Sequence, residues 1–250
     1  MRVAVITPYF REPAETLRRA HDSVLAQTHA ATHFLVADGS PNPAVAGWNA
    51  EHIVLPKAHG DYGDTPRVIG ALSALGQGHD AIAFLDADNW YRPTHIATMI
   101  AAHEHTGFSV CLASRSIHRL DGSFMFDFPE TDNHVDTSCF FLTGEAVRLV
   151  PLMALKPHAL ADQGDRIFWG ALRFRGMSYI RVKAPTVAYT SAWEASYRAA
   201  GETPPEGADK AAVGDSLREW LKATPEAEKA SWSRWLFGAP DRWGSASDDT

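Results

Sequence analysis

The chain has 250 residues, of which 45% are hydrophobic and 21% are charged, and its formal net charge is −7. This length and balance are typical of one large globular domain, or two small ones, with a sizeable buried core. The acidic charge, together with the lack of any run of more than two Lys or Arg, argues against a nucleic-acid partner.

The first 115 residues alternate predicted strands with predicted helices. Apolar runs predict strands over residues 2–7, 33–38, 52–55, 81–86 and 108–114, and helical spacing predicts helices over residues 13–28, 64–76 and 93–105. In the second helix, Thr65 is the expected cap and Pro66 the first helical residue. Such alternation predicts an α/β fold with a mostly parallel sheet and helices on both faces.

The pattern changes after residue 115. We expect an excursion or hairpin over 122–129, a strand over 135–143, helices over 144–150 and 162–176, and two late strands over 178–182 and 186–190.

A linker-like stretch begins near residue 201 and leads to two short predicted helices over 215–237. Ser216 and Glu219 form a capping-box pair, and Thr224 and Pro225 open the second helix. We expect the tryptophans of these helices to pack on the body or across a homodimer. Contact with a membrane surface is the alternative.

Cys111 and Cys139 lie in apolar runs without zinc-site spacing, so we expect two buried thiols. The N-terminal stretch is interrupted too early for a signal peptide, and no apolar run approaches the roughly 18 residues of a membrane span. We therefore expect a cytoplasmic protein with no transmembrane segment.

Polar side chains follow three of the predicted strands. In an open parallel sheet, ligands bind beyond the carboxyl ends of the strands, so we expect these side chains to share a pocket. Asp86 and Asp88 lie one residue apart and can both turn toward one hard divalent cation, Mg²⁺ or Mn²⁺. The alternative is that Asp88 or Asn89 only caps the following helix.

Several segments resemble those of family 2 glycosyltransferases with the GT-A fold. "VAVITPYFREPAETLRRAHDSVLAQTH" resembles the first strand and helix of that family, and "AFLDADNWYRP" resembles its metal-binding D-x-D motif. "FLVADGS" resembles its second strand, although Ala37 replaces the first of two usual aspartates. "VDTSCFFLTGEA" and "DQGDRIFWGALRFRG" resemble the acceptor-side strand and the helix that carries the catalytic base. The resemblance extends from residue 2 to about residue 190.

The resemblance implies one GT-A domain with a Rossmann-like central sheet over residues 1–200. Its nucleotide-binding half would cover 1–115 and its acceptor-binding half 116–200, with a linker and short C-terminal helices over 201–250. The nucleotide would be bound by Thr7, Pro8, Tyr9, Glu12, Asp38, Arg67, Asp86 and Ala87. The metal ion, Mn²⁺ or Mg²⁺, would be bound by Asp88 and Asp86.

Individual roles follow from the same resemblance. Tyr9 would stack on the base, Asp38 would accept a hydrogen bond from it, as from the N3–H of uracil, and Arg67 would lie by the base or the diphosphate. From the residues alone, Tyr9 could instead belong to the core, Asp38 could close a turn, and Arg67 could face solvent.

The catalytic base is assigned to Asp165, with Asp162 as its rival. The family usually has Glu before this Asp, whereas Gly164 stands here. A third metal ligand, often histidine in such enzymes, cannot be placed; His134 and His158 are the candidates.

The implied function is metal-dependent transfer of a sugar from a nucleotide sugar, with a UDP-sugar favoured, to a hydroxyl of a glycan or other acceptor, with inversion. The metal would neutralise the leaving diphosphate and a carboxylate would take the acceptor proton. One alternative is a non-catalytic nucleotide-sugar-binding GT-A protein, because the usual Glu is missing. Another is a nucleotidyltransferase, although "TPYFREP" lacks the glycines of its phosphate loop.

Overall fold

The structure is a computed structural model that describes residues 1–209 and 215–243. Its strands form one sheet in the order β3-β2-β1-β4-β8-β6-β9-β5, with β7 paired to β6 at one end. The strands are β1 (Val3–Tyr9), β2 (Ala31–Ala37), β3 (Glu51–Val54), β4 (Ala81–Phe84), β5 (Trp90–Tyr91), β6 (Val110–His118), β7 (Phe124–Asp127), β8 (Phe140–Thr143) and β9 (Tyr179–Thr190).

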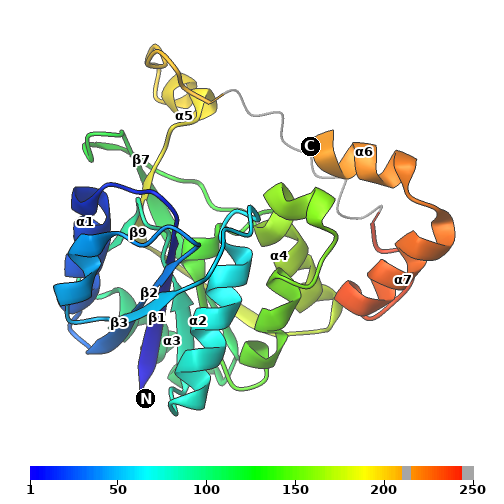
Figure 1. The fold of residues 1–250 in the computed structure, drawn as a ribbon, viewed down its shortest axis with the longest axis horizontal. Helices are drawn as coiled ribbons and strands as arrows, with labels where there is room; N and C mark the ends of the chain where they lie inside the picture. Colours follow the sequence, from blue (N-terminus) through cyan, green and yellow to red (C-terminus); the bar gives the residue numbers. More distant parts are fainter. Residues whose placement is uncertain (210–214, 244–250) are drawn as a thin grey trace.

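The helices pack around this sheet. In Figure 1, α2 and α4 lie in front of the sheet and α3 lies behind it, while α6 and α7 extend to one side. The α-helices are α1 (Ala14–Leu25), α2 (Asp64–Gly76), α3 (His95–Thr106), α4 (Gly164–Phe174), α5 (Glu194–Ala199), α6 (Asp215–Ala223) and α7 (Glu226–Phe237). Short 3-10 helices are η1 (Pro43–Gly47), η2 (Thr137–Cys139), η3 (Ala146–Met153) and η4 (His158–Gln163).

The predicted mixed α/β fold with a mostly parallel sheet is confirmed. Strands β3, β2, β1 and β4 are all parallel, as are β6 and β9, whereas β8 runs antiparallel to both of its neighbours. All residues of β1 and β4 are buried, which explains why both strands are apolar without alternation. The two cysteines are free and buried, as expected.

Four local predictions are wrong. Segment 135–143 is not one strand, because the Asp136 side chain accepts a hydrogen bond from the Ser138 N–H (2.9 Å) and starts η2 before β8. The two late strands are one continuous strand, β9. Thr65 does not cap α2 and Pro66 is not its first residue, because α2 already begins at Asp64; the Thr65 N–H and hydroxyl both donate to the Asp61 carboxylate. Ser216 is not the residue before the first tail helix, as a capping box requires, because α6 already begins at Asp215, and the Ser216 hydroxyl donates to Asp162.

The two predicted tail helices are confirmed, and they pack on the body. Trp235 Nε1 donates to the Leu155 carbonyl oxygen (3.0 Å) and Arg175 Nε donates to the Leu236 carbonyl oxygen (3.1 Å). The apolar contact, which we call the tail cluster, joins Leu152, Leu160, Ile167 and Ala171 of the body to Leu217, Trp220, Leu236, Phe237 and Trp243 of the tail. No helix in the described ranges combines the length and the apolar character that a membrane crossing requires.

We predict that Leu236→Ala lowers the free energy of unfolding by about 2–5 kcal/mol, because Leu236 is fully buried in the tail cluster. Glu228→Ala on the exposed face of the same helix is the control and should change stability by no more than about 0.5 kcal/mol. Chemical denaturation measures both. Equal stabilities for the two variants would show that the tail does not pack on the body in solution.

Candidate functional site

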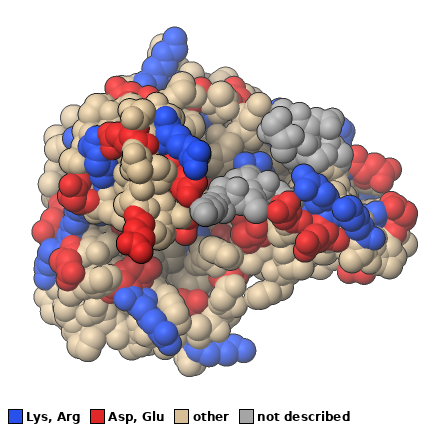
Figure 2. Space-filling model, turned by 90° about the horizontal axis from the view of Figure 1, so that it is seen from above, with Lys and Arg blue, Asp and Glu red and all other residues tan. Residues whose placement is uncertain are grey.

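A pocket of about 670 Å³ opens at the carboxyl ends of β1, β2 and β4 and is closed on its other side by α4. Figure 2 looks onto this edge of the sheet and shows acidic side chains gathered around a hollow. The pocket is lined by Pro8, Tyr9, Phe10, Glu12, Asp38, Gly60, Asp61, Tyr62, Gly63, Asp64, Arg67, Asp86, Ala87, Asp88, Asp136, Thr137, Ala161, Asp162, Gly164, Asp165 and Tyr189.

Every predicted site residue except Thr7 therefore lies on the pocket wall. The Thr7 side chain is buried, and its hydroxyl lies 2.9 Å from His33 Nε2. Burial and the neighbouring His21 lower the pKa of His33 to about 3, so that its ring is neutral. Thr7 thus belongs to the polar core beneath the pocket, not to its lining.

Tyr9 lines the pocket, but its ring packs against His52. The ring is stacked on that of His52, with centroids 5.9 Å apart, and only 2% of the residue is exposed. Its hydroxyl lies 2.6 Å from His52 Nε2 and accepts a hydrogen bond from the Asn42 N–H (3.1 Å). Tyr9 is therefore a rigid part of the wall with little free surface.

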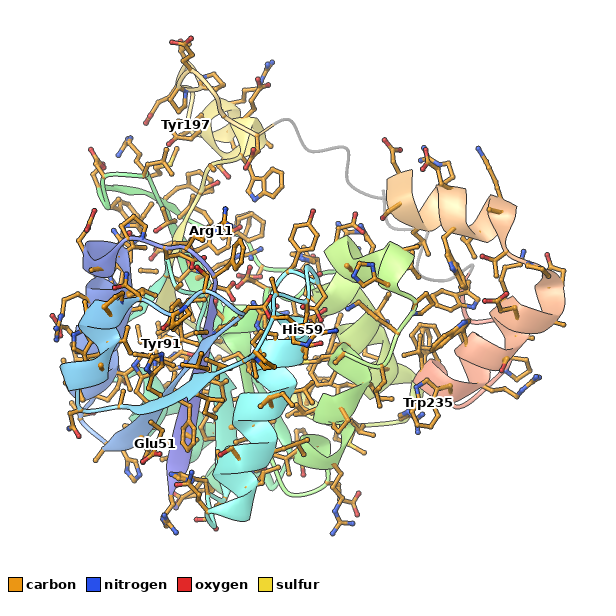
Figure 3. All side chains as sticks on the ribbon, in the orientation of Figure 1. Arg11, Glu51, His59, Tyr91, Tyr197 and Trp235 are labelled. Atoms are coloured by element: carbon orange, nitrogen blue, oxygen red, sulfur yellow. The ribbon has the colours of Figure 1, made fainter. Side chains whose placement is uncertain are left out.

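Asp38 ends β2 and is fixed by His59. The backbone N–H of His59 donates to both carboxylate oxygens, at 3.1 and 3.0 Å, and the His59 ring Nδ1 lies 2.7 Å from Oδ1. Figure 3 shows His59 on the loop before α2, on the side that faces α4. His158 Nε2 lies 3.3 Å from the His59 carbonyl oxygen, so this loop also contacts η4.

A chain of paired charges, buried except for the half-buried Asp86, runs from the segment after β4 to the segment between η3 and η4. Arg67 Nη2 donates to Asp86, and Arg67 Nη1 lies 3.4 Å from Asp64 Oδ1. Lys156 Nζ donates to the other oxygen of Asp64 and to the Met153 carbonyl oxygen (2.9 Å). We call this set, Asp86, Arg67, Asp64 and Lys156, the charge chain.

Burial has opposite effects on two members of the charge chain. It raises the pKa of Asp64 to about 6, even though Lys156 and Arg67 act to lower it. Burial alone would lower the pKa of Arg67, but the carboxylates of Asp86 and Asp64 raise it above its ordinary value. Arg67 is therefore a permanent cation at the pocket wall.

Asp88 is exposed on the pocket wall close to other carboxylates. Loss of water in the pocket and the charges of Asp86, Asp136 and Glu12 raise the pKa of Asp88 to about 7. Because the side chain itself reaches solvent, we attribute more of this shift to the neighbouring carboxylates than to desolvation. Such mutual repulsion is relieved by a bound cation.

The residues around the D-x-D motif suit a cation that completes its shell with phosphate oxygens and water. Mg²⁺ is commonly held by one or two carboxylates in this way. Within residues 1–209 and 215–243, no group of three or more His, Cys, Asp or Glu side chains is arranged to hold a metal ion. The two candidates for a third ligand are engaged elsewhere: His134 contacts Asp165 and His158 contacts the His59 carbonyl oxygen.

Asp165 lies in the first turn of α4 and is paired with His134, whose Nε2 is 2.6 Å from Asp165 Oδ2. The Arg166 N–H donates to the other oxygen (2.7 Å). Burial alone would raise the pKa of Asp165, but the hydrogen bond and charge of His134 and the Arg166 N–H lower it below its ordinary value. Asp165 is therefore an ionised carboxylate in a fixed orientation at neutral pH.

Asp162, the rival base, lies in η4 and has different partners. Its Oδ2 accepts hydrogen bonds from the Ser216 hydroxyl (2.7 Å) and from Gln163 Nε2 (3.0 Å). The contact with Ser216 connects the pocket wall to α6.

The structure explains why glycine, and not the usual Glu, stands at position 164. A Cβ atom at this position would lie 2.2 Å from Asp64 Oδ2, which is far closer than atoms can approach. A Glu at this position would displace the Asp64 carboxylate from Lys156. The Asp64 carboxylate thus occupies the space that a side chain at position 164 would need.

Sequence reasoning missed Asp61, Tyr62, Asp64 and Lys156. The first three lie in the segment "GDYGDTPR", whose two glycines and two acids ahead of a helix were a usable signal. Lys156 is separated from Asp64 by 92 residues, and no local pattern joins them.

Residues 4–134 match the family model described as "Glycosyl transferase family 2". The chain has no match among curated protein sequences.

Solved structures of S. aureus TarS share the fold. The structure of TarS residues 1–349 with UDP is 15% identical, with a TM-score of 0.59, and the match covers 95% of this chain and 72% of that chain. The same fragment with UDP-GlcNAc is 13% identical, with a TM-score of 0.60, and the match covers 98% of this chain and 84% of that one. The longer TarS chain is 14% identical, with a TM-score of 0.61, and the match covers 100% of this chain but 46% of that one. Together with the sheet order, these likenesses confirm the predicted GT-A fold.

We predict that Gly164→Ala destabilises the protein by about 1–3 kcal/mol, because the added methyl group must displace the buried Asp64 carboxylate. Gly76→Ala, at the end of α2, is the matched control. No atom lies within 4 Å of its added Cβ, so this change should stabilise the protein by about 0.4–1 kcal/mol. Urea denaturation measures both; a neutral Gly164→Ala would contradict the close approach of Asp64.

Proposed function

The chain belongs to glycosyl transferase family 2, and on this premise we propose that it transfers a sugar from a UDP-sugar to an acceptor hydroxyl, with the help of a divalent cation and with inversion. One observation carries the proposal: a single pocket brings together a D-x-D motif, a buried arginine and an oriented carboxylate on α4. These are the groups needed to hold a diphosphate and to accept a proton.

Residues 1–115 would form the donor-binding half and residues 116–200 the acceptor-binding half. Strands β1, β2 and β4 and helix α2 supply Tyr9, Asp38, Asp86 and Arg67, all of which lie on the pocket wall. A UDP-sugar is favoured because Asp38 can accept a hydrogen bond from the uracil N3–H, and because the TarS structures were solved with UDP and UDP-GlcNAc.

The charge of the pocket supports a requirement for a cation. Of its lining residues, nine are acidic and Arg67 is the one Lys or Arg among them. A diphosphate is itself negative, and the single guanidinium of the lining, already paired with Asp86 and Asp64, supplies only one positive charge, so the site remains repulsive. A divalent cation held by Asp88 and Asp86 would supply the missing positive charge to the leaving diphosphate.

Asp165 suits the role of general base. It is ionised, it lines the pocket, and its pairing with His134 holds the carboxylate in one orientation. Deprotonation of the acceptor hydroxyl by Asp165 would accompany its attack on the anomeric carbon. Asp162 also lines the pocket. Among the described residues, both of its hydrogen bonds go to Oδ2, so its other oxygen is not fixed in the same way.

We predict that UDP binds more tightly with Mg²⁺ or Mn²⁺ than with EDTA, and that Asp88→Ala abolishes this difference, because Asp88 would be a main ligand of the cation. Titration calorimetry in the two buffers measures the effect. Asp22→Asn, on the exposed face of α1, is the control and should keep the full metal dependence. Equal UDP affinity of the wild-type protein in both buffers would argue against a metal-dependent enzyme.

We predict that Asp165→Asn reduces turnover of a UDP-sugar by about 10²–10⁴-fold with nearly unchanged UDP affinity, because the base contacts the acceptor and not the nucleotide. The assay is release of UDP from a panel of UDP-sugars, with Asp162→Asn measured in parallel. A fully active Asp165→Asn with an inactive Asp162→Asn would move the role to Asp162. A wild-type protein that binds UDP-sugars but turns over none of them would indicate a non-catalytic binding protein.

A further inference from the structure

Asp61 is a buried pocket residue with one carboxylate oxygen that lacks a partner. The residue is 7% exposed and lines the pocket. Its Oδ2 accepts hydrogen bonds from the N–H (2.9 Å) and the hydroxyl (2.5 Å) of Thr65. Its Oδ1 is buried and has no hydrogen-bond partner among the residues that the structure describes. Since buried polar atoms are nearly always hydrogen-bonded, we expect this oxygen to receive a donor that the described residues do not supply.

The loop that carries Asp61 is held in an unusual conformation. Gly60, Tyr62 and Gly63 all have positive φ, at 66°, 55° and 86°, and Tyr62 is the one of the three for which this conformation is costly. Two contacts hold the loop: Arg67 Nη1 donates to the Tyr62 carbonyl oxygen (2.9 Å), and the Asp64 N–H donates to that of Asp61 (3.2 Å). The position of the Asp61 carboxylate is thus set before any ligand arrives.

The residue after Asp61 on the same loop presents an aromatic ring to the pocket. Tyr62 is 74% exposed and lines the pocket, whereas Tyr9 is buried and stacked on His52. An exposed ring and a hydrogen-bond acceptor on one loop of the pocket suit a flat base or the apolar face of a sugar ring that also carries a donor group.

We propose that Asp61 is a donor-binding residue, whose Oδ1 accepts a hydrogen bond from an O–H or N–H group of the bound nucleotide sugar. The inference rests on the proposed function. The diphosphate carries only acceptors at neutral pH and would be repelled, so the partner belongs to the base, the ribose or the transferred sugar. The Asp64 N–H donates to the Asp61 carbonyl oxygen (3.2 Å) and the Asp64 carboxylate lies against Gly164, so Asp61 belongs to the side of the pocket nearest the start of α4.

The substitution Asp61→Asn separates this role from simple electrostatics. Asn keeps the size of the side chain and can still accept from Thr65, but it presents an N–H₂ group where the free oxygen lies. If Asp61 binds the donor, affinity should fall by about tenfold or more, as expected for a lost hydrogen bond to a charged group. If Asp61 acts only through its negative charge, its removal should tighten the binding of anionic nucleotides.

The matched control is Thr65→Val, which removes one donor to Asp61 Oδ2 and leaves Oδ1 unchanged. This variant should lower the melting temperature but keep nucleotide affinity within about twofold of wild type. If Asp61→Asn and Thr65→Val instead lose affinity in proportion to their loss of melting temperature, Asp61 is only a helix cap and the proposal fails.

The experiment measures the dissociation constants of UDP, UDP-glucose and UDP-GlcNAc for wild type and both variants by calorimetry, with Mg²⁺ and with EDTA. A loss in Asp61→Asn for all three ligands assigns the contact to the nucleoside, and a loss for UDP-sugars but not UDP assigns it to the sugar; either result supports the proposal. Unchanged or tighter binding by Asp61→Asn overturns it. A wild-type protein that binds none of these ligands would overturn the proposed function itself, and this inference with it.

Discussion

The buried charge chain is the constraint on which the pocket depends. Asp86, Arg67, Asp64 and Lys156 come from the end of β4, from α2 and from the segment after η3, and each needs its neighbour because an unpaired buried charge is costly. The charge chain therefore fixes the spacing between the wall formed at the ends of β1, β2 and β4 and the start of α4. It also requires Gly164, since any larger residue would push Asp64 away from Lys156.

The parts of the site that sequence reasoning predicted are those set by local rules. Asp38 follows β2, and Asp86 and Asp88 follow β4; parallel strands bring their carboxyl ends to one edge. Thr7 shares a face of β1 with Tyr9, two residues further along the strand, but it lies deeper, and only the structure shows that its buried hydroxyl contacts His33. Pairings such as His134 with Asp165 arise when distant segments pack together, so no spacing in the sequence predicts them.

The tail stabilises more than its own helices. Its apolar residues cover Leu160 and Ile167 of η4 and α4, and these two elements carry Asp162 and Asp165. The hydrogen bond from Ser216 to Asp162 brings α6 to the rim of the pocket itself. The tail thus acts as a support for the helix that presents the candidate base, which gives the tryptophans a structural role within one chain.

Strand β8 lies between β4 and β6 and is antiparallel to both. Its direction affects where the sequence can vary without disturbing the sheet. An antiparallel strand begins at the edge where its parallel neighbours end, so Asp136 and Ser138 enter beside the D-x-D motif; the Ser138 hydroxyl accepts from the N–H of Asp86 (3.2 Å). The segment between β7 and β8 leads directly into this edge. Natural or engineered insertions there can reshape the pocket next to β8 while the register of the sheet, and with it the wall formed by β1, β2 and β4, stays unchanged.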